Sequence, residues 1–246
     1  MMRVKLIACE VLYRELCDAI ASAPLMVDVE FLPKGLHDRG GAAMRKELQA
    51  MIDRVDPATY SAILLGYGLC GNGLHGLVAR SLPLVAPRVH DCIGLLMGSR
   101  HRYLQYFNDH SGVYFRSTGW FERGAGLEQL SQLRTGAGYE LDDLIRKYGE
   151  ENGRYLFDEL YRYRQNYKRL TFIETGLEPD SRFEDQARQE ARARDWSFEK
   201  IRADLSLFRA LVRGDWDTSD FLVVQPGWRI VARYDDGIIH AEMEFQ

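Results

Sequence analysis

Residues 4–21 read VKLIACEVLYRELCDAIA, in which a compact apolar strand passes directly into a helix. The apolar run predicts a strand over residues 4–10, and helical spacing predicts a helix over residues 11–21. Residues 26–32 alternate apolar and polar side chains, which predicts a second strand. The alternation continues with a helix, two strands and a helix over residues 42–55, 60–66, 82–87 and 91–107. Because parallel strands need crossover connections, this order predicts a mainly parallel sheet flanked by helices.

The second half of the chain repeats the alternation after a turn-rich segment, residues 112–126, and a long helical stretch, residues 127–168. Glycines interrupt that helical stretch at residues 136–138 and at Gly149. Strands and helices are then expected in turn over residues 169–174, 182–194, 197–201, 203–212 and 221–225.

The fold class expected from the whole pattern is α/β, with mainly parallel sheets flanked by helices. A small C-terminal hairpin is expected over residues 228–245, where an Asp-Asp-Gly sequence supplies the turn. The two halves predict two Rossmann-like lobes, residues 1–126 and 127–246, or one continuous sheet to which the second half returns.

The composition is that of a globular protein, since 46% of the 246 residues are hydrophobic and 11% are aromatic. The formal net charge of −4 gives no general attraction to nucleic acid or anionic lipid, so neither is expected as a partner. Residues 155–170 mix aromatic and basic side chains, a composition that can bind single-stranded nucleic acid. Their helical spacing favours an amphipathic helix with a solvated face, which leaves a small molecule as the expected partner.

The chain is expected to be cytoplasmic. Its first residues do not read as a signal peptide, and no apolar run approaches the ~18 residues that a membrane span needs. Thiols stay reduced in that compartment, so the four cysteines are not expected to form a disulfide framework.

Three cysteines and one histidine fall where the predicted strands end. Cys9 ends the first strand, Cys70 follows the strand at residues 60–66, and His90 and Cys92 follow the strand at residues 82–87. The carboxyl ends of strands in an open α/β sheet border the crevice where ligands bind, so these side chains are expected to converge. Three thiolates and one imidazole form a known tetrahedral zinc set, which makes a shared metal site the leading interpretation.

A structural interpretation of the same cysteines stays open. Cysteine is among the most buried residue types, so the three side chains could simply line strand ends. Cys17, inside the first helix, is expected to be a packing residue. Asp91 is expected to cap the following helix or to accept a hydrogen bond from an imidazole N–H.

The glycine-rich turn at residues 66–76, GYGLCGNGLHG, follows a strand and carries Cys70. Glycines there let the backbone approach a ligand closely, and exposed N–H groups can bind an anion, although a tight structural turn is the alternative. Its first glycines match the Gly-x-Gly-x-x-Gly spacing of the dinucleotide-binding fingerprint. The segment is not that fingerprint, because further glycines follow the match. The expected substrate-binding residues, from this turn and from other predicted strand ends, are Gly68, Gly71, Asn72, Arg88, Tyr114, Thr118, Trp120 and Gly227.

Several sequence blocks resemble a domain family of unknown function that occurs in archaea and bacteria. The blocks are IAC at 7–9, REL at 14–16, LGYGLCGNGL at 65–74, PRVHDCI at 87–93 and LLMGS at 95–99. The family commonly has a Thr-Pro-Gly-Trp segment, which reads Ser-Thr-Gly-Trp at 117–120 here and lacks the proline. The resemblance covers residues 3–125, with a weaker match at 221–227.

The resemblance implies a metal site, because the family's recurrent Cys, Cys and His-Asp-Cys set matches Cys9, Cys70, His90 and Cys92. Members are sometimes encoded beside corrinoid-dependent methyl-transfer systems. The leading hypothesis is therefore a metal-dependent enzyme of transferase or lyase type that carries out methyl-group or thiol chemistry on a small molecule. Zinc would be bound by the three cysteines, with His90 as a fourth ligand or catalytic partner.

Two other functions remain open for this set of side chains. An iron–sulfur enzyme would use the three cysteines as cluster ligands and would leave His90 as an acid or base. A non-catalytic metal-binding module would instead serve a corrinoid protein as an accessory, with corrinoid present only through that partner.

Overall fold

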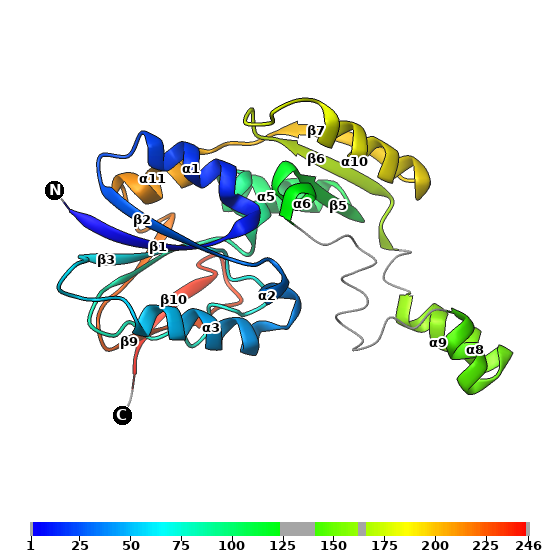
Figure 1. Cartoon of the computed structure of the whole chain (residues 1–246), viewed down its shortest axis with the longest axis horizontal. Helices are drawn as coiled ribbons and strands as arrows, with labels where there is room; N and C mark the ends of the chain where they lie inside the picture. The colour runs from blue at the N-terminus through cyan, green and yellow to red at the C-terminus, as the bar shows by residue number, and fades with distance from the viewer. Residues whose placement is uncertain (1, 124–140, 162–165, 245–246) are drawn as a thin grey trace.

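The computed structural model describes residues 2–123, 141–161 and 166–244, and it confirms an α/β fold with a mostly parallel sheet. The central sheet has the strand order β2-β1-β3-β4-β8 (Figure 1). Its strands span Arg3–Cys9 (β1), Met26–Leu32 (β2), Ala62–Gly66 (β3), Leu84–Pro87 (β4) and Phe221–Val224 (β8). The first four strands run parallel, and β8 pairs antiparallel with β4.

Helices cover both faces of the central sheet. In Figure 1, α1 and α11 lie together on one face, and α3 lies on the other. These elements and two short ones span Glu10–Leu12 (η1), Tyr13–Ala21 (α1), Gly35–Asp38 (α2), Gly41–Asp53 (α3) and Ser206–Arg213 (α11). Side chains such as Leu6, Leu64 and Phe208 are fully buried between these layers. Burial of each of these side chains stabilises the fold by about 1.5–3 kcal/mol. The sheet whose edge carries the predicted site is therefore firmly packed.

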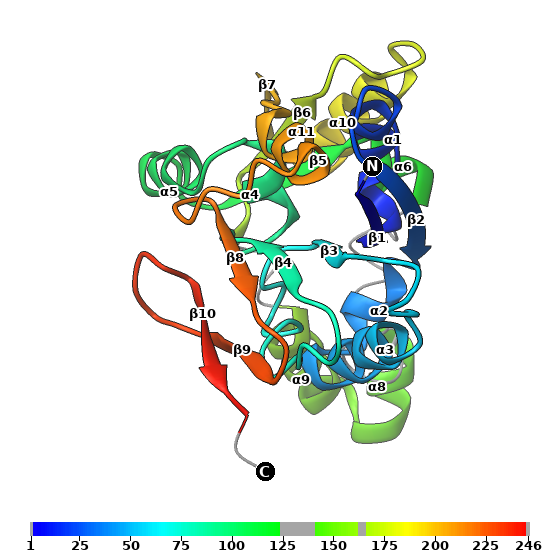
Figure 2. The same ribbon diagram turned by 90° about the vertical axis from the view of Figure 1, so that its left-hand side faces the viewer.

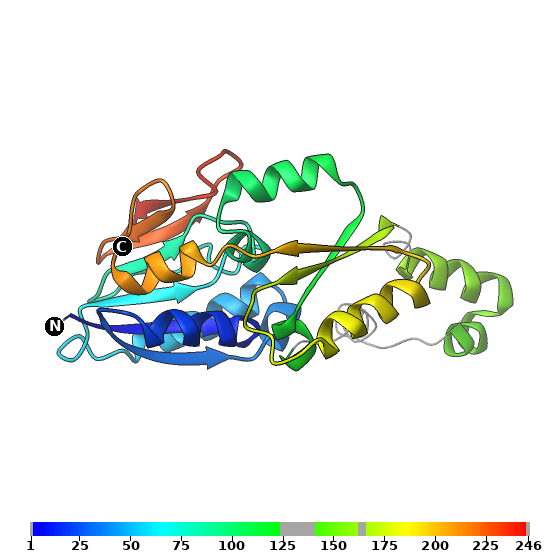
Figure 3. The ribbon, with the colours of Figure 1, turned by 90° about the horizontal axis from the view of Figure 1, so that it is seen from above.

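A second, three-stranded parallel sheet has the order β5-β6-β7. Its strands and helix span Val113–Ser117 (β5), Arg169–Glu174 (β6), Ser197–Arg202 (β7) and Arg182–Ala193 (α10). Figure 3 shows α10 lying along β6 and β7, where Phe183 and Ala187 close a small separate core over Phe172. Because β5 belongs to this sheet while α11 and β8 return to the first one, the sheets do not divide the chain at residue 126. The domain boundary proposed there stays a prediction.

The C-terminal hairpin is confirmed and consists of β9 (Trp228–Ala232) and β10 (Ile239–Met243), paired antiparallel. It lies beside β8 (Figure 2). A hydrogen bond of 2.8 Å from the Arg233 N–H to the Ile238 carbonyl oxygen closes its connection. The Arg88 guanidinium ties that connection to the central sheet by donating to carbonyl oxygens on both.

The single helix expected over residues 91–107 is two helices, α4 (Cys92–Leu96) and α5 (Arg100–Asp109). Gly98 separates them with a left-handed backbone, φ 69°. A Cβ at this position would lie 2.5 Å from the carboxyl carbon of Asp204, so close tertiary packing also selects glycine. The left-handed residue ends the first helix, and this corrects the prediction.

The turn-rich segment expected over residues 112–126 contains strand β5 and a short helix, α6 (Thr118–Arg123). α6 packs on η1, where a Cβ at Gly119 would overlap the carbonyl oxygen of Val11. This contact joins residues more than a hundred positions apart, so local spacing did not predict the helix.

Part of the helical stretch expected over residues 127–168 is observed. α8 (Leu141–Tyr148) and α9 (Glu150–Tyr161) break at Gly149, as predicted, where φ is 82°. The other interruption, at residues 136–138, lies outside the described residues. Across the described parts of the chain, no helix has the length and apolar character to cross a membrane.

Candidate functional site

The carboxyl ends of β1, β3 and β4 lie at one edge of the central sheet, because the three strands run parallel. Cys9 is the last residue of β1, Gly66 ends β3 and Pro87 ends β4. The glycine-rich turn and the segment at residues 88–91 therefore both start at this edge. Ligands of open α/β sheets bind at such an edge.

Two backbone hydrogen bonds join the glycine-rich turn to the segment after β4. The N–H of Leu69 donates to the carbonyl oxygen of Val89 at 2.9 Å, and the N–H of Cys70 donates to that of His90 at 2.8 Å. Cys92 is the first residue of α4, directly after this segment. The pairing therefore holds Cys70 beside the start of α4.

Close packing of these two segments requires glycine at position 68. A Cβ there would lie 2.7 Å from the Cα of Asp91. We expect Gly68→Ala to push the segments apart and to lower the free energy of unfolding by about 1–3 kcal/mol. The matched control is Gly35→Ala, whose Cβ would meet no described atom within 4 Å. Denaturant unfolding compares the variants, and equal stability of the two would contradict the packing argument.

Three consecutive residues of the turn have a left-handed backbone. The φ angles are 48° at Cys70, 62° at Gly71 and 67° at Asn72. A non-glycine residue in this region costs about 1–3 kcal/mol, and such residues cluster at functional sites. The turn therefore holds Cys70 and Asn72, both predicted site residues, in a strained backbone conformation.

The side chains of Cys9, Cys70 and Cys92 form a group that we call the thiol cluster. Cys70 and Cys92 are hydrogen-bonded to each other through their side chains, and Cys9 interacts electrostatically with both. All three also act on the buried hydroxyl of Tyr67, whose pKa is raised mainly by burial and further by the three sulfurs. The three cysteines therefore lie near one another at this edge of the sheet. That they converge with His90 on one metal ion stays a prediction.

Burial and the nearby sulfurs favour the neutral form of the Cys9 and Cys92 thiols. Burial raises the pKa of Cys9 to about 12, and the nearby Cys70 adds to the shift. The hydrogen bond with Cys70, followed by burial, raises the pKa of Cys92 well above its usual value. Cys9 and Cys92 are therefore stable as neutral thiols next to each other, and a cation that bound them would displace their protons.

Lys34 is a charged residue of this site that the sequence interpretation missed. Its side chain is 6% exposed, and its charge lowers the pKa of Cys9, opposing the effect of burial. Glu10 accepts a hydrogen bond from the backbone N–H of Lys34 at 2.9 Å. Lys34 comes two residues after β2, which runs parallel to β1, and that position is the signal that could have placed it at this edge.

Asp91 caps α4, as predicted. Its Oδ1 accepts hydrogen bonds from the N–H groups of Ile93 at 3.0 Å and Gly94 at 3.2 Å. Its Oδ2 accepts a hydrogen bond from the Tyr103 hydroxyl at 3.0 Å. The donor to this oxygen is therefore a phenol and not the imidazole N–H that the sequence suggested. The cap fixes the helix turn that carries Cys92.

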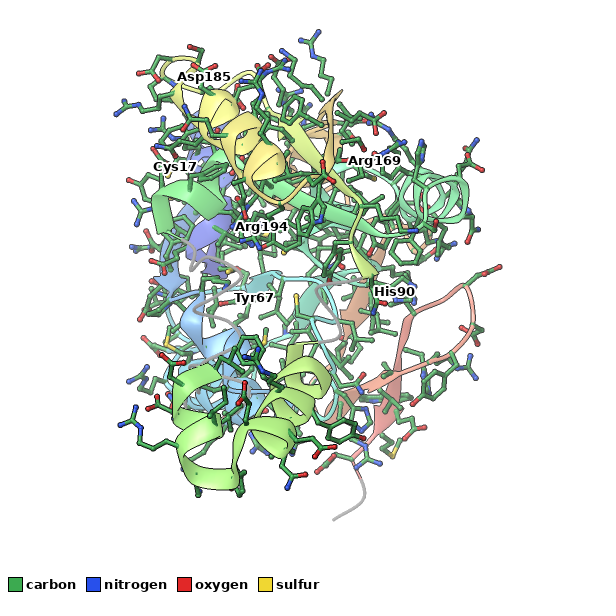
Figure 4. The ribbon with its side chains drawn as sticks, turned by 90° about the vertical axis from the view of Figure 1, so that its right-hand side faces the viewer. Cys17, Tyr67, His90, Arg169, Asp185 and Arg194 are labelled. Carbon is green, nitrogen blue, oxygen red and sulfur yellow. The ribbon has the colours of Figure 1, made fainter. Side chains whose placement is uncertain are left out.

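His90 lines a pocket of ≈ 380 Å³ beside the thiol cluster. The ring lies 6.4 Å from that of Tyr103, measured between centroids. In Figure 4, His90 lies on the side of the C-terminal hairpin, whereas Tyr67 lies nearer the middle of the molecule. The pocket is also lined by Leu69, Asn72, Leu104 and the hairpin connection. Its size suits a small molecule.

No three His, Cys, Asp or Glu side chains among the described residues already surround a single point in metal-binding geometry. The thiol cluster instead keeps a hydrogen bond between two of its sulfurs. Its chemistry fits a soft-ligand site, since thiolates select zinc and iron–sulfur clusters. Metal binding here would exchange that hydrogen bond for bonds to the ion.

Two predicted substrate-binding residues have structural roles. Arg88 donates from Nε to the carbonyl oxygen of Thr218 at 2.9 Å and from Nη1 to that of Gly237 at 3.1 Å, and it also bonds Ile239. Gly227 follows β8, which is antiparallel, so it lies at the opposite edge of the sheet from the thiol cluster. The expectation that Gly227 completes the same crevice assumed a parallel β8 and is corrected here.

Tyr114 lies in the smaller core of the second sheet. Its ring is 5.7 Å from that of Trp196, and burial raises its pKa to about 12. Thr118 and Trp120, by contrast, lie on α6, which packs against η1, the short helix directly after Cys9. Thr118 is fully buried, and Trp120 packs on the main core. Thr118 and Trp120 therefore lie on an element that packs against η1, next to the Cys9 end of β1.

Several buried polar groups on this side of the sheet have no hydrogen-bond partner among the described residues. They are both carboxyl oxygens of Glu15 and the hydroxyls of Ser117 and Thr118. Glu15 is 1% exposed, and burial, followed by the charge of Glu178, raises its pKa to about 7. Sequence interpretation missed Glu15, because an isolated glutamate in a helix usually faces solvent.

Comparison with known proteins gives one family. Residues 31–212 match the family described as a protein of unknown function (DUF1638). The matched range includes Cys70, His90 and Cys92 and begins after Cys9. Neither the curated proteins nor the solved structures contain a match.

Proposed function

Since the chain belongs to DUF1638, a family of proteins of unknown function, we propose a function for it from its site. We propose a metal-dependent enzyme that acts on a small molecule, with zinc bound by Cys9, Cys70 and Cys92. The observation that supports this proposal is the thiol cluster, in which three sulfurs from three strand ends interact. His90 is the proposed fourth ligand or exchangeable partner.

The donor chemistry supports zinc. Three sulfurs and one imidazole match a known ligand set, and bound zinc would supply Lewis acidity that activates a thiol or water. The buried Lys34 adds positive charge beside Cys9 and would offset the negative charge of three thiolates. The left-handed backbone at Cys70 aims its side chain from a strained turn, as expected for a residue with a chemical role.

The proposed substrate site is the pocket lined by His90 and Asn72. The carbonyl group of His90 is bound to the N–H of Cys70, so this pocket and the thiol cluster lie on neighbouring parts of one hydrogen-bonded pair of segments. As an exchangeable partner rather than a permanent ligand, His90 would carry a proton to or from the substrate there. Methyl-group or thiol chemistry is the proposed reaction, because a metal bound by the sulfurs would hold them as thiolates and could activate a thiol or water.

An iron–sulfur enzyme is the second candidate function, and one observation favours it. His90 lines the pocket, whereas the three cysteines alone form the thiol cluster. Three cysteine ligands with a separate histidine would suit a cluster that leaves one iron open to substrate.

Metal analysis of anaerobically purified protein tests these proposals. About one equivalent of zinc in colourless protein supports the zinc enzyme. Iron with acid-labile sulfide and a brown colour supports the cluster enzyme. Zinc together with a co-purifying corrinoid protein, and no turnover of small thiols or methyl donors, would identify an accessory module. Absence of every metal from protein made in supplemented medium would refute metal-dependent function.

A further inference from the structure

A second pocket, of ≈ 420 Å³, lies where β7 leads into α11. Three arginines line it from three elements: Arg102 from α5, Arg202 from the end of β7 and Arg209 from α11. We propose that this pocket binds a small phosphate-bearing molecule. The site shares no residue with the thiol cluster or the His90 pocket, so it is independent of the function proposed above.

The charges in this pocket are unbalanced. Asp204 is the one acidic side chain in its lining, against three guanidinium groups. Its Oδ1 already accepts a hydrogen bond from the N–H of Ser206 at 2.9 Å. Gathering three cations around one carboxylate is unfavourable without an anion, so the pocket attracts negative charge.

The arginines also have unused hydrogen-bonding capacity. Within the described part of the chain, the Arg202 guanidinium makes no hydrogen bond or ion pair. Arg209 has a loose ion pair, 3.9 Å from its Nη2 to Asp18 Oδ2. Arg102 donates from Nη2 to the carbonyl oxygen of Arg202 at 2.7 Å and from Nη1 to that of Met97 at 3.3 Å. Arg102 is thus fixed in place, while the guanidinium groups of Arg202 and Arg209 can donate hydrogen bonds to a ligand.

Phosphate chemistry fits this arrangement best. Guanidinium groups form paired, charge-assisted hydrogen bonds to phosphate oxygens, and three of them can surround one phosphate. The pocket also holds more than a phosphate ion, and Ala203 and Leu205 give it an apolar wall. A phosphate monoester with a small organic part therefore matches both its charge and its lining.

Arg102 also connects this pocket to the thiol cluster through one helix. The next residue, Tyr103, donates its hydroxyl to Asp91, and Asp91 caps the helix that begins at Cys92.

Calorimetric titration with inorganic phosphate and with glycerol 3-phosphate, at constant ionic strength, tests the proposal. We expect both to bind the whole protein, with glycerol 3-phosphate binding more tightly. Arg202→Gln and Arg209→Gln should each weaken binding by about 10-fold, the loss expected for one charge-assisted contact.

The matched control is Arg213→Gln, because Arg213 lies on the same helix, α11, outside the pocket and pairs with Asp215. It should bind glycerol 3-phosphate as the unmodified protein does. The proposal is overturned if neither phosphate compound binds, or if binding is unchanged in the Arg202→Gln/Arg209→Gln double variant. Since no step of the test depends on bound metal, its failure leaves the zinc proposal untouched.

Discussion

Cys70→Ser and Cys92→Ser are each expected to reduce the zinc bound by anaerobically purified protein from about one equivalent to less than about a tenth. Serine keeps the size of the side chain but is a poor ligand for zinc. Loss of an outer-shell partner typically weakens zinc binding by about 10–100-fold, so loss of a direct ligand should exceed that range. Elemental analysis after gel filtration measures the change.

Cys17→Ser is the matched control for this experiment. Cys17 lies on α1, and Figure 4 shows it well apart from Tyr67, around which the thiol cluster gathers. Zinc content should not change in this variant. Equal zinc in all three variants would refute the proposed site, and circular dichroism would show whether each remains folded.

His90→Ala separates the two metal hypotheses. If the imidazole is a zinc ligand, this variant should lose zinc nearly as completely as the cysteine variants. If three cysteines hold an iron–sulfur cluster, iron and sulfide should stay bound while turnover falls. Chain folding is not expected to suffer, since the ring borders a pocket rather than the main core.

The second large effect concerns Glu15 and pH. Its pKa is raised from 4.5 to about 7 in the folded protein, mainly by burial. The folded chain therefore keeps a proton that the unfolded chain releases, and stability falls as the pH rises from about 4.5 to about 7. Between about pH 5 and about pH 8 the loss from this one group should be about 2–3 kcal/mol.

Glu15→Gln removes that titration, because the amide stays neutral at every pH. Urea unfolding of both proteins at several pH values should show the extra loss only in the unmodified chain. Glu47→Gln, at an exposed position on α3, is the control and should keep the full pH dependence. Parallel stability curves for the unmodified chain and Glu15→Gln would show that Glu15 is not protonated when folded.

Much of the central sheet followed from local sequence pattern. The strand ending at Cys9 and the strand before the glycine-rich turn are short apolar runs bounded by turns, and both are observed. Parallel connection of these strands predicts that Cys9, Cys70 and Cys92 lie at one edge. Their proximity follows from the sheet topology, which a helix–strand alternation predicts well.

Other features depend on contacts between distant parts of the chain. The break at Gly98 comes from the approach of Asp204, and the short helix at α6 comes from packing on Val11. Gly227 lies at the opposite edge of the sheet from the one expected, because β8 runs antiparallel to β4. The sequence of a short apolar strand does not indicate its direction in the sheet. Lys34 and Glu15 were missed for a related reason: burial of a charged side chain is decided by its neighbours in space.

The return of β8 to the central sheet has a consequence for synthesis of the protein. Its pairing joins Leu84 to Val224, so the outer edge of β4 stays uncovered until most of the chain has left the ribosome. An uncovered strand edge can pair with other chains, and distant pairings slow folding. Chains that end before β8, or that are translated slowly, should therefore aggregate through β4, whereas β8 covers that edge in the folded protein.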